Sequence, residues 1–133
     1  MQIALRVLEI ECTDPITLGR FWSAALGSPI GPGSDGVHIK FPGNIPQFLY
    51  LVEERDSARP RNRTRIWLNP LQGSLAEEIE RLTKLGATVI ERRWRHKEYG
   101  LGVVILTDPE GNEFCVESSD REVAEVRALM EED

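Results

Sequence analysis

The chain has 133 residues, of which 41% are hydrophobic and 29% charged, proportions that are typical of one soluble globular domain. Its net charge of −6 argues against nucleic-acid binding, and no apolar run approaches the roughly 18 residues of a membrane-spanning helix. The first residues lack a signal-peptide pattern, and the two cysteines do not form a disulfide framework. We therefore expect a single cytoplasmic domain over 1–133, with neither nucleic acid nor a membrane as a partner.

The first half of the chain alternates between strand and helix signals. In chain order it is predicted to contain a strand at 5–12, a helix at 15–26, and strands at 37–41 and 48–53. Asp14 is suited to cap the helix, Pro15 to occupy its first position, and Gly27 to end it. The charged segment at 55–62 is expected to link this half to the next.

The second half repeats this order of elements. It is predicted to contain a strand at 65–69, a helix at 75–85, strands at 88–92, 103–106 and 114–117, and a final amphipathic helix at about 120–131. Ser74 and Glu77 form the pattern of a capping box. A shift of 59 residues superposes Arg6 on Arg65 and Gly27 on Gly86, which favours two half-repeats, at about 3–54 and 64–118.

Three motifs in this order resemble one protein family. They are Phe-Trp-Ser-Ala-Ala-Leu-Gly at 21–27, Leu-Gly-Ala-Thr-Val at 85–89 and Asp-Pro-Glu-Gly-Asn-Glu-Phe-Cys-Val at 108–116. Together they resemble the glyoxalase/bleomycin-resistance/dioxygenase (vicinal oxygen chelate) superfamily, in its glyoxalase-like domain branch. The resemblance implies an α+β fold in which two βαβββ half-repeats form a curled mixed sheet, a cup, with the helix at about 120–131 added.

The resemblance also indicates where metal ligands would lie. Metal-dependent members hold the ion with four His or Glu residues in the cup, from the first and last strands of each half. Carried onto this chain, these positions fall at Val7, Leu49, Trp67 and Cys115. Such side chains cannot form an oxygen and nitrogen site for a divalent ion, so we expect neither a metal nor another cofactor. Cys115 as a nucleophile is also disfavoured, because Glu113 and Glu117 flank it.

Strand alternation extends the predicted lining of the cup. If those four residues face the cup, their neighbours two positions away face it too: Glu9, Glu11, Gln47, Leu51, Arg65, Asn69, Glu113 and Glu117. The intervening residues, Phe48 and Tyr50 among them, would then pack against the helices. Such a cup combines an indole and aliphatic groups with carboxylates, which suits an aromatic or cationic organic molecule.

Two functions compete at this point. The first is metal-free binding or sequestration of a small molecule, as in bleomycin-resistance proteins. The alternative is a metal-independent lyase or isomerase, in which desolvation raises the pKa of Glu9 or Glu11 so that it serves as a general base. The substitutions argue against a metal-dependent glyoxalase or dioxygenase. The family resemblance further implies a homodimer, and Trp94 and Tyr99 are expected at a rim or dimer contact.

Overall fold

The fold consists of two compact units, Met1–Asn62 and Arg63–Asp133, each with the order βαβββ. The computed structural model describes residues 2, 5–33, 35–43, 47–54 and 64–131. Each unit contains one four-stranded mixed sheet, so the predicted α+β class and the two half-repeats are confirmed. The expected linker at 55–62 lies outside the described residues. Among the described residues, no helix combines the length and the apolarity that crossing a membrane requires.

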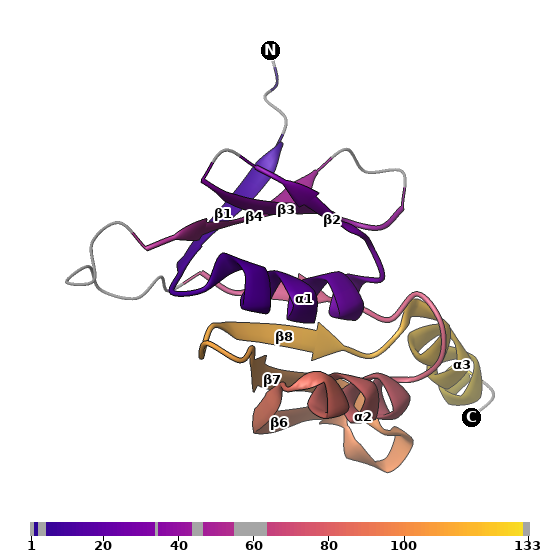
Figure 1. The fold of residues 1–133 in the computed structure, drawn as a ribbon. Coiled ribbons are helices and arrows are strands. Elements are labelled where there is room, and N and C mark those ends of the chain that lie inside the picture. Colours follow the sequence, from indigo (N-terminus) through magenta and orange to yellow (C-terminus); the bar gives the residue numbers. More distant parts are fainter. Residues whose placement is uncertain (1, 3–4, 34, 44–46, 55–63, 132–133) are drawn as a thin grey trace. The chain divides into compact units, whose positions relative to one another are not determined.

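The N-terminal unit packs one helix on one face of its sheet (Figure 1). Its elements are β1 (Val7–Cys12), α1 (Pro15–Leu26), β2 (Ile30–Pro32), β3 (Gly36–Lys40) and β4 (Phe48–Glu53). The sheet order is β1-β4-β3-β2, with β1 parallel to β4 and the other pairs antiparallel. The short strand β2 was not among the predicted elements, because its Ile-Gly-Pro sequence contains two residues that are rare in strands.

Helix α1 begins and ends as its sequence predicts. The Asp14 carboxylate accepts a hydrogen bond from the Thr17 N–H at 3.1 Å, and Gly27 adopts the left-handed conformation, φ 69°, that ends the helix. Gly19 gives the helix its close approach to the sheet: a Cβ there would meet the side chains of Val37 and Leu51. These two residues therefore mark the helix-facing side of the sheet.

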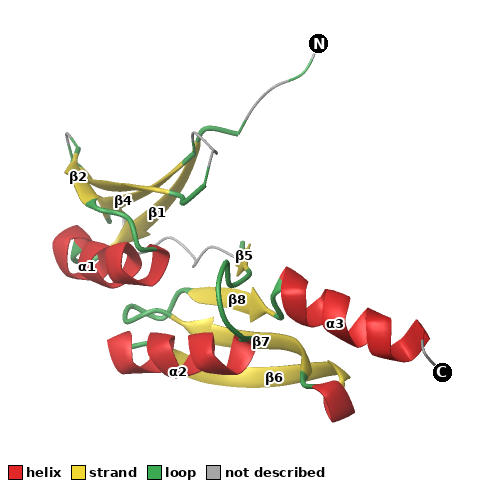
Figure 2. Cartoon of the chain, turned by 90° about the vertical axis from the view of Figure 1, so that its right-hand side faces the viewer, coloured by secondary structure: helices red, strands yellow, loops and turns green. Residues whose placement is uncertain are grey.

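The C-terminal unit repeats the arrangement with additions (Figure 2). Its elements are β5 (Ile66–Leu68), α2 (Leu75–Leu85), β6 (Thr88–His96), the 3-10 turn η1 (Lys97–Tyr99), β7 (Leu101–Thr107), β8 (Glu113–Glu117) and α3 (Asp120–Glu131). The sheet order is β5-β8-β7-β6, with β5 parallel to β8. Helix α2 buries Leu75, Ile79 and Leu82 in its core.

Helices α2 and α3 each begin with a capping box, and the second box also joins the two helices. Ser74 and Glu77 form the predicted box at the start of α2. At the start of α3, the Ser119 hydroxyl accepts from the Glu122 N–H, and the Glu122 carboxylate accepts from the Ser119 N–H at 3.0 Å. The same Glu122 oxygen accepts from the Leu75 N–H at 2.8 Å, so one carboxylate serves the first turns of both helices. Helix α3 therefore docks on its own unit.

A buried carboxylate fixes the turn between β7 and β8. Asp108 is 3% exposed, and its Oδ1 accepts from the N–H groups of Glu110 and Asn112 at 3.0 and 2.9 Å. The Asn112 side-chain amide donates to the same carboxylate, and Gly111 supplies the positive φ of the turn, 86°. The turn therefore sets the register of β8 against β7.

Candidate functional site

The C-terminal sheet presents one face that carries an exposed indole. In the register of β5 with β8, Trp67 lies opposite Cys115, whereas Ile66 and Leu68 lie opposite Phe114 and Val116. Phe114 and Val116 are buried on the side that also carries Leu106 and Val104 of β7. We call the other side, with Trp67, Cys115, Glu113 and Glu117, the Trp67 face. Trp67 is 56% exposed there, although the indole is the largest apolar side chain available for a core.

Charged residues of both signs surround Cys115 on this face. The Arg65 Nε donates to Glu113 Oε2 at 2.9 Å, and the Arg65 Nη2 forms an ion pair with the same oxygen at 2.8 Å. Burial raises the pKa of the Cys115 thiol, the nearby Arg65 and Arg93 lower it, and Glu113 and Glu117 raise it. The thiol is therefore held in its protonated form, which agrees with the interpretation of Cys115 as a buried strand residue rather than a nucleophile.

The structure adds residues to this face that the sequence interpretation omitted. Glu91 and Arg93 of β6 lie opposite Ile105 and Val103 of β7, which are themselves on the Trp67 side. The Arg93 guanidinium pairs with Glu91 at 3.2 Å, which raises the pKa of Arg93. The omission arose because only the first and last strands of each half were considered. Alternation in β6 does not reveal the face either, since register shifts interrupt it between Val89 and Glu91 and between Trp94 and His96.

Asn69, which was also predicted to line the cup, follows the end of β5. Its side-chain amide donates to the Asp120 carboxylate at 3.4 Å. Asn69 thus connects the chain after β5 to the first turn of α3.

In the N-terminal unit the predicted register of β4 is wrong by one residue. Leu49 is 0% exposed and lies opposite Ile39, on the side of Val37 and Leu51 that packs against α1. Leu49 therefore belongs to the helix-packed core and not to the opposite face, and the same holds for Leu51. The error came from β4 itself, which is apolar on both faces, so that its pattern does not distinguish them.

Phe48 occupies the place that was assigned to Leu49. It lies opposite Val7, as Cys115 lies opposite Trp67 in the other unit. Phe48 and Tyr50 thus join the predicted Val7, Glu9 and Glu11 on the side away from α1, which we call the Tyr50 face.

Glycine makes room for the aromatic groups of the Tyr50 face. His38 lies opposite Gly31, and a Cβ at Gly31 would overlap its ring, just as one at Gly33 would overlap Tyr50. The His38 ring meets the Phe48 ring edge-on at 5.4 Å between centroids, and the Tyr50 hydroxyl donates to Asp35 at 2.7 Å. The Tyr50 face therefore combines closely packed aromatic rings with the carboxylates of β1.

The two carboxylates predicted as general bases lie on this face. Glu9 is exposed, and Glu11 is half-buried. The general-base hypothesis requires a carboxylate that is removed from water, and Glu9 is exposed to water instead. The described residues provide no specific observation in favour of the lyase or isomerase alternative.

The residues that the family resemblance assigns to ligand positions, with Phe48 in the place of Leu49, do not fit a metal ion. Val7, Phe48 and Trp67 offer no oxygen or nitrogen atom suited to coordination, and the Cys115 thiol is kept protonated. Across the described residues, no group of three or more His, Cys, Asp or Glu side chains could hold an ion.

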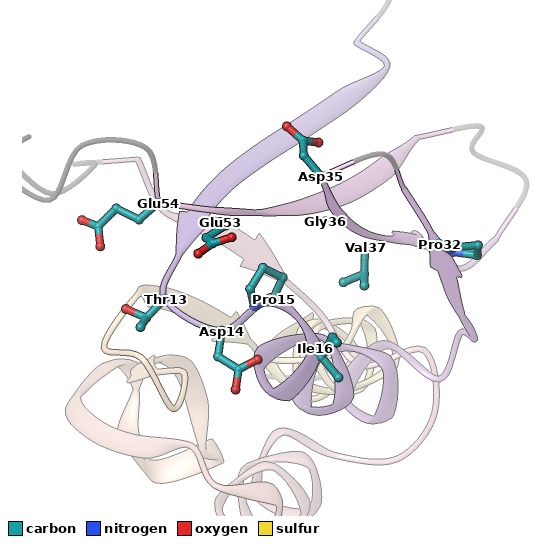
Figure 3. A pocket seen from close by; sticks show the side chains of 10 residues that line it. All are labelled: Thr13, Asp14, Pro15, Ile16, Pro32, Asp35, Gly36, Val37, Glu53 and Glu54. Carbon is teal, nitrogen blue, oxygen red and sulfur yellow. The ribbon is translucent and has the colours of Figure 1, made fainter.

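An open hollow of about 740 Å³ lies in the N-terminal unit beside the start of α1 (Figure 3). Pro15, Ile16 and Val37 line it, together with four carboxylates, those of Asp14, Asp35, Glu53 and Glu54. Figure 3 shows these carboxylates spread around the hollow rather than converging on one point. Asp14 caps α1 and Asp35 accepts from Tyr50, so both serve the fold.

The fold and the three motifs indicate the class of this protein. A family model described as "Glyoxalase-like domain" matches residues 7–117, nearly the whole of both units. The chain belongs to the glyoxalase-like domain family.

Solved structures with the same fold include proteins that bind antibiotics or confer resistance to them. An integron cassette protein of Vibrio cholerae is 20% identical, with a TM-score of 0.63 over 90% of this chain and 98% of that one. The antibiotic binding protein TnmS3 from Streptomyces sp. CB03234 is 19% identical, with a TM-score of 0.62 over 88% and 97%.

A fosfomycin resistance protein from Listeria monocytogenes, solved with Mn(II) and dihydroxypropylphosphonic acid, is 16% identical, with a TM-score of 0.64 over 91% and 92%. At such identities these likenesses show the fold alone. No curated protein matches the chain significantly.

Proposed function

We propose that this protein binds a small, flat organic molecule of aromatic or cationic character on the Trp67 face, without a metal ion. The observation that carries the proposal is the exposed indole of Trp67 on the edge strand β5, on the face that also carries the charged side chains around Cys115. An exposed tryptophan on a sheet face loses hydrophobic stabilisation that burial in the core would give it. A flat ligand that stacks on the indole would recover that stabilisation.

The charges of the Trp67 face favour a cationic ligand. The face carries three carboxylates (Glu91, Glu113 and Glu117) and two guanidinium groups (Arg65 and Arg93). The ion pairs Arg65–Glu113 and Arg93–Glu91 balance two of the carboxylates, so the face has an excess of one negative charge. A cation over an indole gains about 0.5–1 kcal/mol at an exposed site, and a nearby carboxylate adds to this attraction.

The family membership supports a binding role in a further way. TnmS3 shares this fold and is described as an antibiotic binding protein, so the scaffold is compatible with binding as a function. We extend this role to the present chain because its ligand positions lack metal donors while an aromatic platform remains. The proposed role is binding or sequestration, as in bleomycin-resistance proteins, and includes no chemical step.

The test compares two planar probes of similar size and opposite charge. Proflavine, an aromatic cation, and anthracene-2-sulfonate, an aromatic anion, are titrated into the protein by isothermal calorimetry, which does not depend on tryptophan emission. We expect proflavine to bind more tightly than the sulfonate. Trp67→Ala should weaken that binding by roughly tenfold, corresponding to about 1.4 kcal/mol of lost stacking.

Trp94→Ala is the matched control, because Trp94 is also exposed, at 45%, and lies away from the Trp67 face. It should leave proflavine affinity unchanged. Equal effects of the two substitutions, or preference for the sulfonate, would refute the assignment of the face. Metal analysis of the purified protein should find no stoichiometric divalent ion, and finding one would refute the metal-free part of the proposal.

A further inference from the structure

The end of β6 and the turn η1 that follows it carry a positive charge in an acidic protein. We call residues 91–99 the basic segment. Its charged side chains are four cations and two carboxylates: Arg92, Arg93, Arg95, Lys97, Glu91 and Glu98. With His96 neutral, the net charge of the segment is +2, whereas the whole chain carries −6. The segment is therefore a local exception in the charge distribution, and such a patch attracts anionic groups.

Three cations of the basic segment have no ion-pair partner among the described residues. The two carboxylates of the segment lie beside Arg93, at 3.2 Å, and beside the ring of His96, at 4.0 Å. In the part of the chain that the structure describes, no carboxylate forms an ion pair with Arg92, Arg95 or Lys97, and all three side chains are exposed. Their charges therefore remain available to an anionic partner.

Two exposed aromatic side chains lie among these cations. Trp94 is 45% exposed and Tyr99 is 40% exposed. Trp94 lies opposite Gly102 of β7, which has no side chain to cover the indole. A Cβ at Gly102 would overlap the Arg93 carbonyl oxygen, so the pairing of β6 with β7 requires glycine there and leaves the indole open to a partner. Trp, Tyr and Arg are also the residue types that contribute most to binding at protein interfaces.

Charges on an outer strand have a simpler explanation, which is protection of the sheet against aggregation. Strand β6 is the last strand of its sheet, and charged side chains on such a strand discourage pairing with other chains. That explanation does not account for Trp94 and Tyr99, since exposed aromatic side chains promote association rather than prevent it. The combination of unpaired cations with open aromatic rings favours a binding surface instead.

The spacing of the cations favours an extended partner over a small anion. Residues 92 and 96 of a strand are about 13 Å apart, at about 3.3 Å per residue, so one small anion cannot contact both Arg92 and Lys97. An extended acidic peptide spans that length. A long polyanion such as nucleic acid would also be repelled by the rest of the chain, which carries −8, the difference between −6 and +2.

We propose that the basic segment is a docking surface for an acidic, extended segment of another protein. Carboxylates of that partner pair with Arg92, Arg95 and Lys97, and one of its apolar side chains covers the Trp94 indole. Within the described residues β6 has no strand neighbour on its outer side, so the partner's backbone can lie along it. The surface is distinct from the Trp67 face, because Trp94 and Gly102 lie on the opposite side of the sheet.

The test is fluorescence anisotropy with the full chain and three rhodamine-labelled probes. These are a ten-residue peptide of alternating Glu and Val, the same peptide with Gln in place of Glu, and a ten-nucleotide oligothymidylate. We expect the Glu peptide to bind most tightly, and its affinity to fall as salt is added, because salt screens charges at exposed sites. Equal affinity for the two peptides, tighter binding of the oligonucleotide, or no binding of the Glu peptide would each overturn the proposal.

Substitutions then locate the binding. Arg92→Glu replaces an attraction by a repulsion and should weaken binding of the Glu peptide by roughly tenfold, and Trp94→Ala should weaken it by roughly threefold. Arg127→Glu on α3 makes the same change of net charge at an exposed site outside the basic segment, and should change the affinity by less than about twofold.

Trp67→Ala separates the two surfaces, because it should weaken proflavine binding and leave binding of the Glu peptide unchanged. Circular dichroism checks that every variant is folded. A loss in Arg127→Glu as large as that in Arg92→Glu would refute the location of the docking surface. Unchanged affinity in both Arg92→Glu and Trp94→Ala would refute it as well.

Discussion

Replacement of Glu122 by Ala is expected to destabilise the C-terminal unit more than the loss of another carboxylate on the same helix would. The carboxylate accepts from Leu75 N–H at 2.8 Å and from Ser119 N–H at 3.0 Å. Both donors are orphan groups of a first helical turn, and neither has an intrahelical acceptor. A hydrogen bond to a charged group contributes about 1.5–3 kcal/mol, and the partial exposure of these bonds favours the lower end. We therefore expect a loss of about 2–4 kcal/mol.

Urea unfolding followed by far-UV circular dichroism measures this loss. Hydrogen exchange should localise it to the first turns of α2 and α3. Glu125→Ala is the matched control in the same helix, where the exposed carboxylate forms an ion pair with the exposed Arg121 at 3.7 Å. That substitution should change stability by less than about 0.5 kcal/mol. Equal stability of the two variants would refute the assignment of Glu122 as a shared cap.

Three other outcomes follow from the structure. Hydrogen bonds from the Thr17 side chain and backbone lower the pKa of Asp14 in the folded protein below its ordinary value of 3.8. The ionised cap therefore stabilises the protein fully above pH 3.8, and this stabilisation is lost as the pH falls through the lowered pKa of the folded state. The melting temperature of Asp14→Ala should therefore approach that of the wild type in acid, and a gap independent of pH would contradict this. Burial raises the pKa of Cys115, so Ellman's reagent should react slowly with native protein and rapidly after unfolding; fast native labelling would restore the nucleophile interpretation. Gly31→Val should displace the His38 ring and cost about 1–3 kcal/mol in urea unfolding, and an unchanged midpoint would contradict the close approach.

The sequence predicts helix boundaries best, because the residue types that begin and end a helix follow local rules of hydrogen bonding and backbone conformation. The caps at Asp14 and Ser74 and the helix ends at Gly27 and Gly86 follow from hydrogen bonding and φ alone, and the structure confirms them. The second capping box, at Ser119, has the same pattern, yet its contact with α2 could not be predicted because it joins segments distant in the sequence.

The sequence predicts in some strands, but not in others, which side chains face the helix and which face away from it. Strand β1 alternates between carboxylates and aliphatic residues, and the predicted placement of Glu9 and Glu11 opposite the core agrees with the register. Strand β4 has Phe48, Leu49, Tyr50 in succession, and only its packing against α1 decides which residues are internal. In β6 a register shift between Val89 and Glu91 places Glu91 and Arg93 on the face opposite to that of Val89, which alternation along the whole strand does not predict. The residues of each face could therefore be predicted only in strands whose side chains alternate between polar and apolar.

The Asp108 turn has a consequence for how this scaffold can change. Because its carboxylate binds backbone groups of its own loop, it holds the alignment of β7 with β8 independently of what the strand side chains are. Residues such as Cys115 and Glu117 can therefore be exchanged without the strand slipping. A protein built in this way can acquire a new specificity by substitutions on one face while its architecture stays constant.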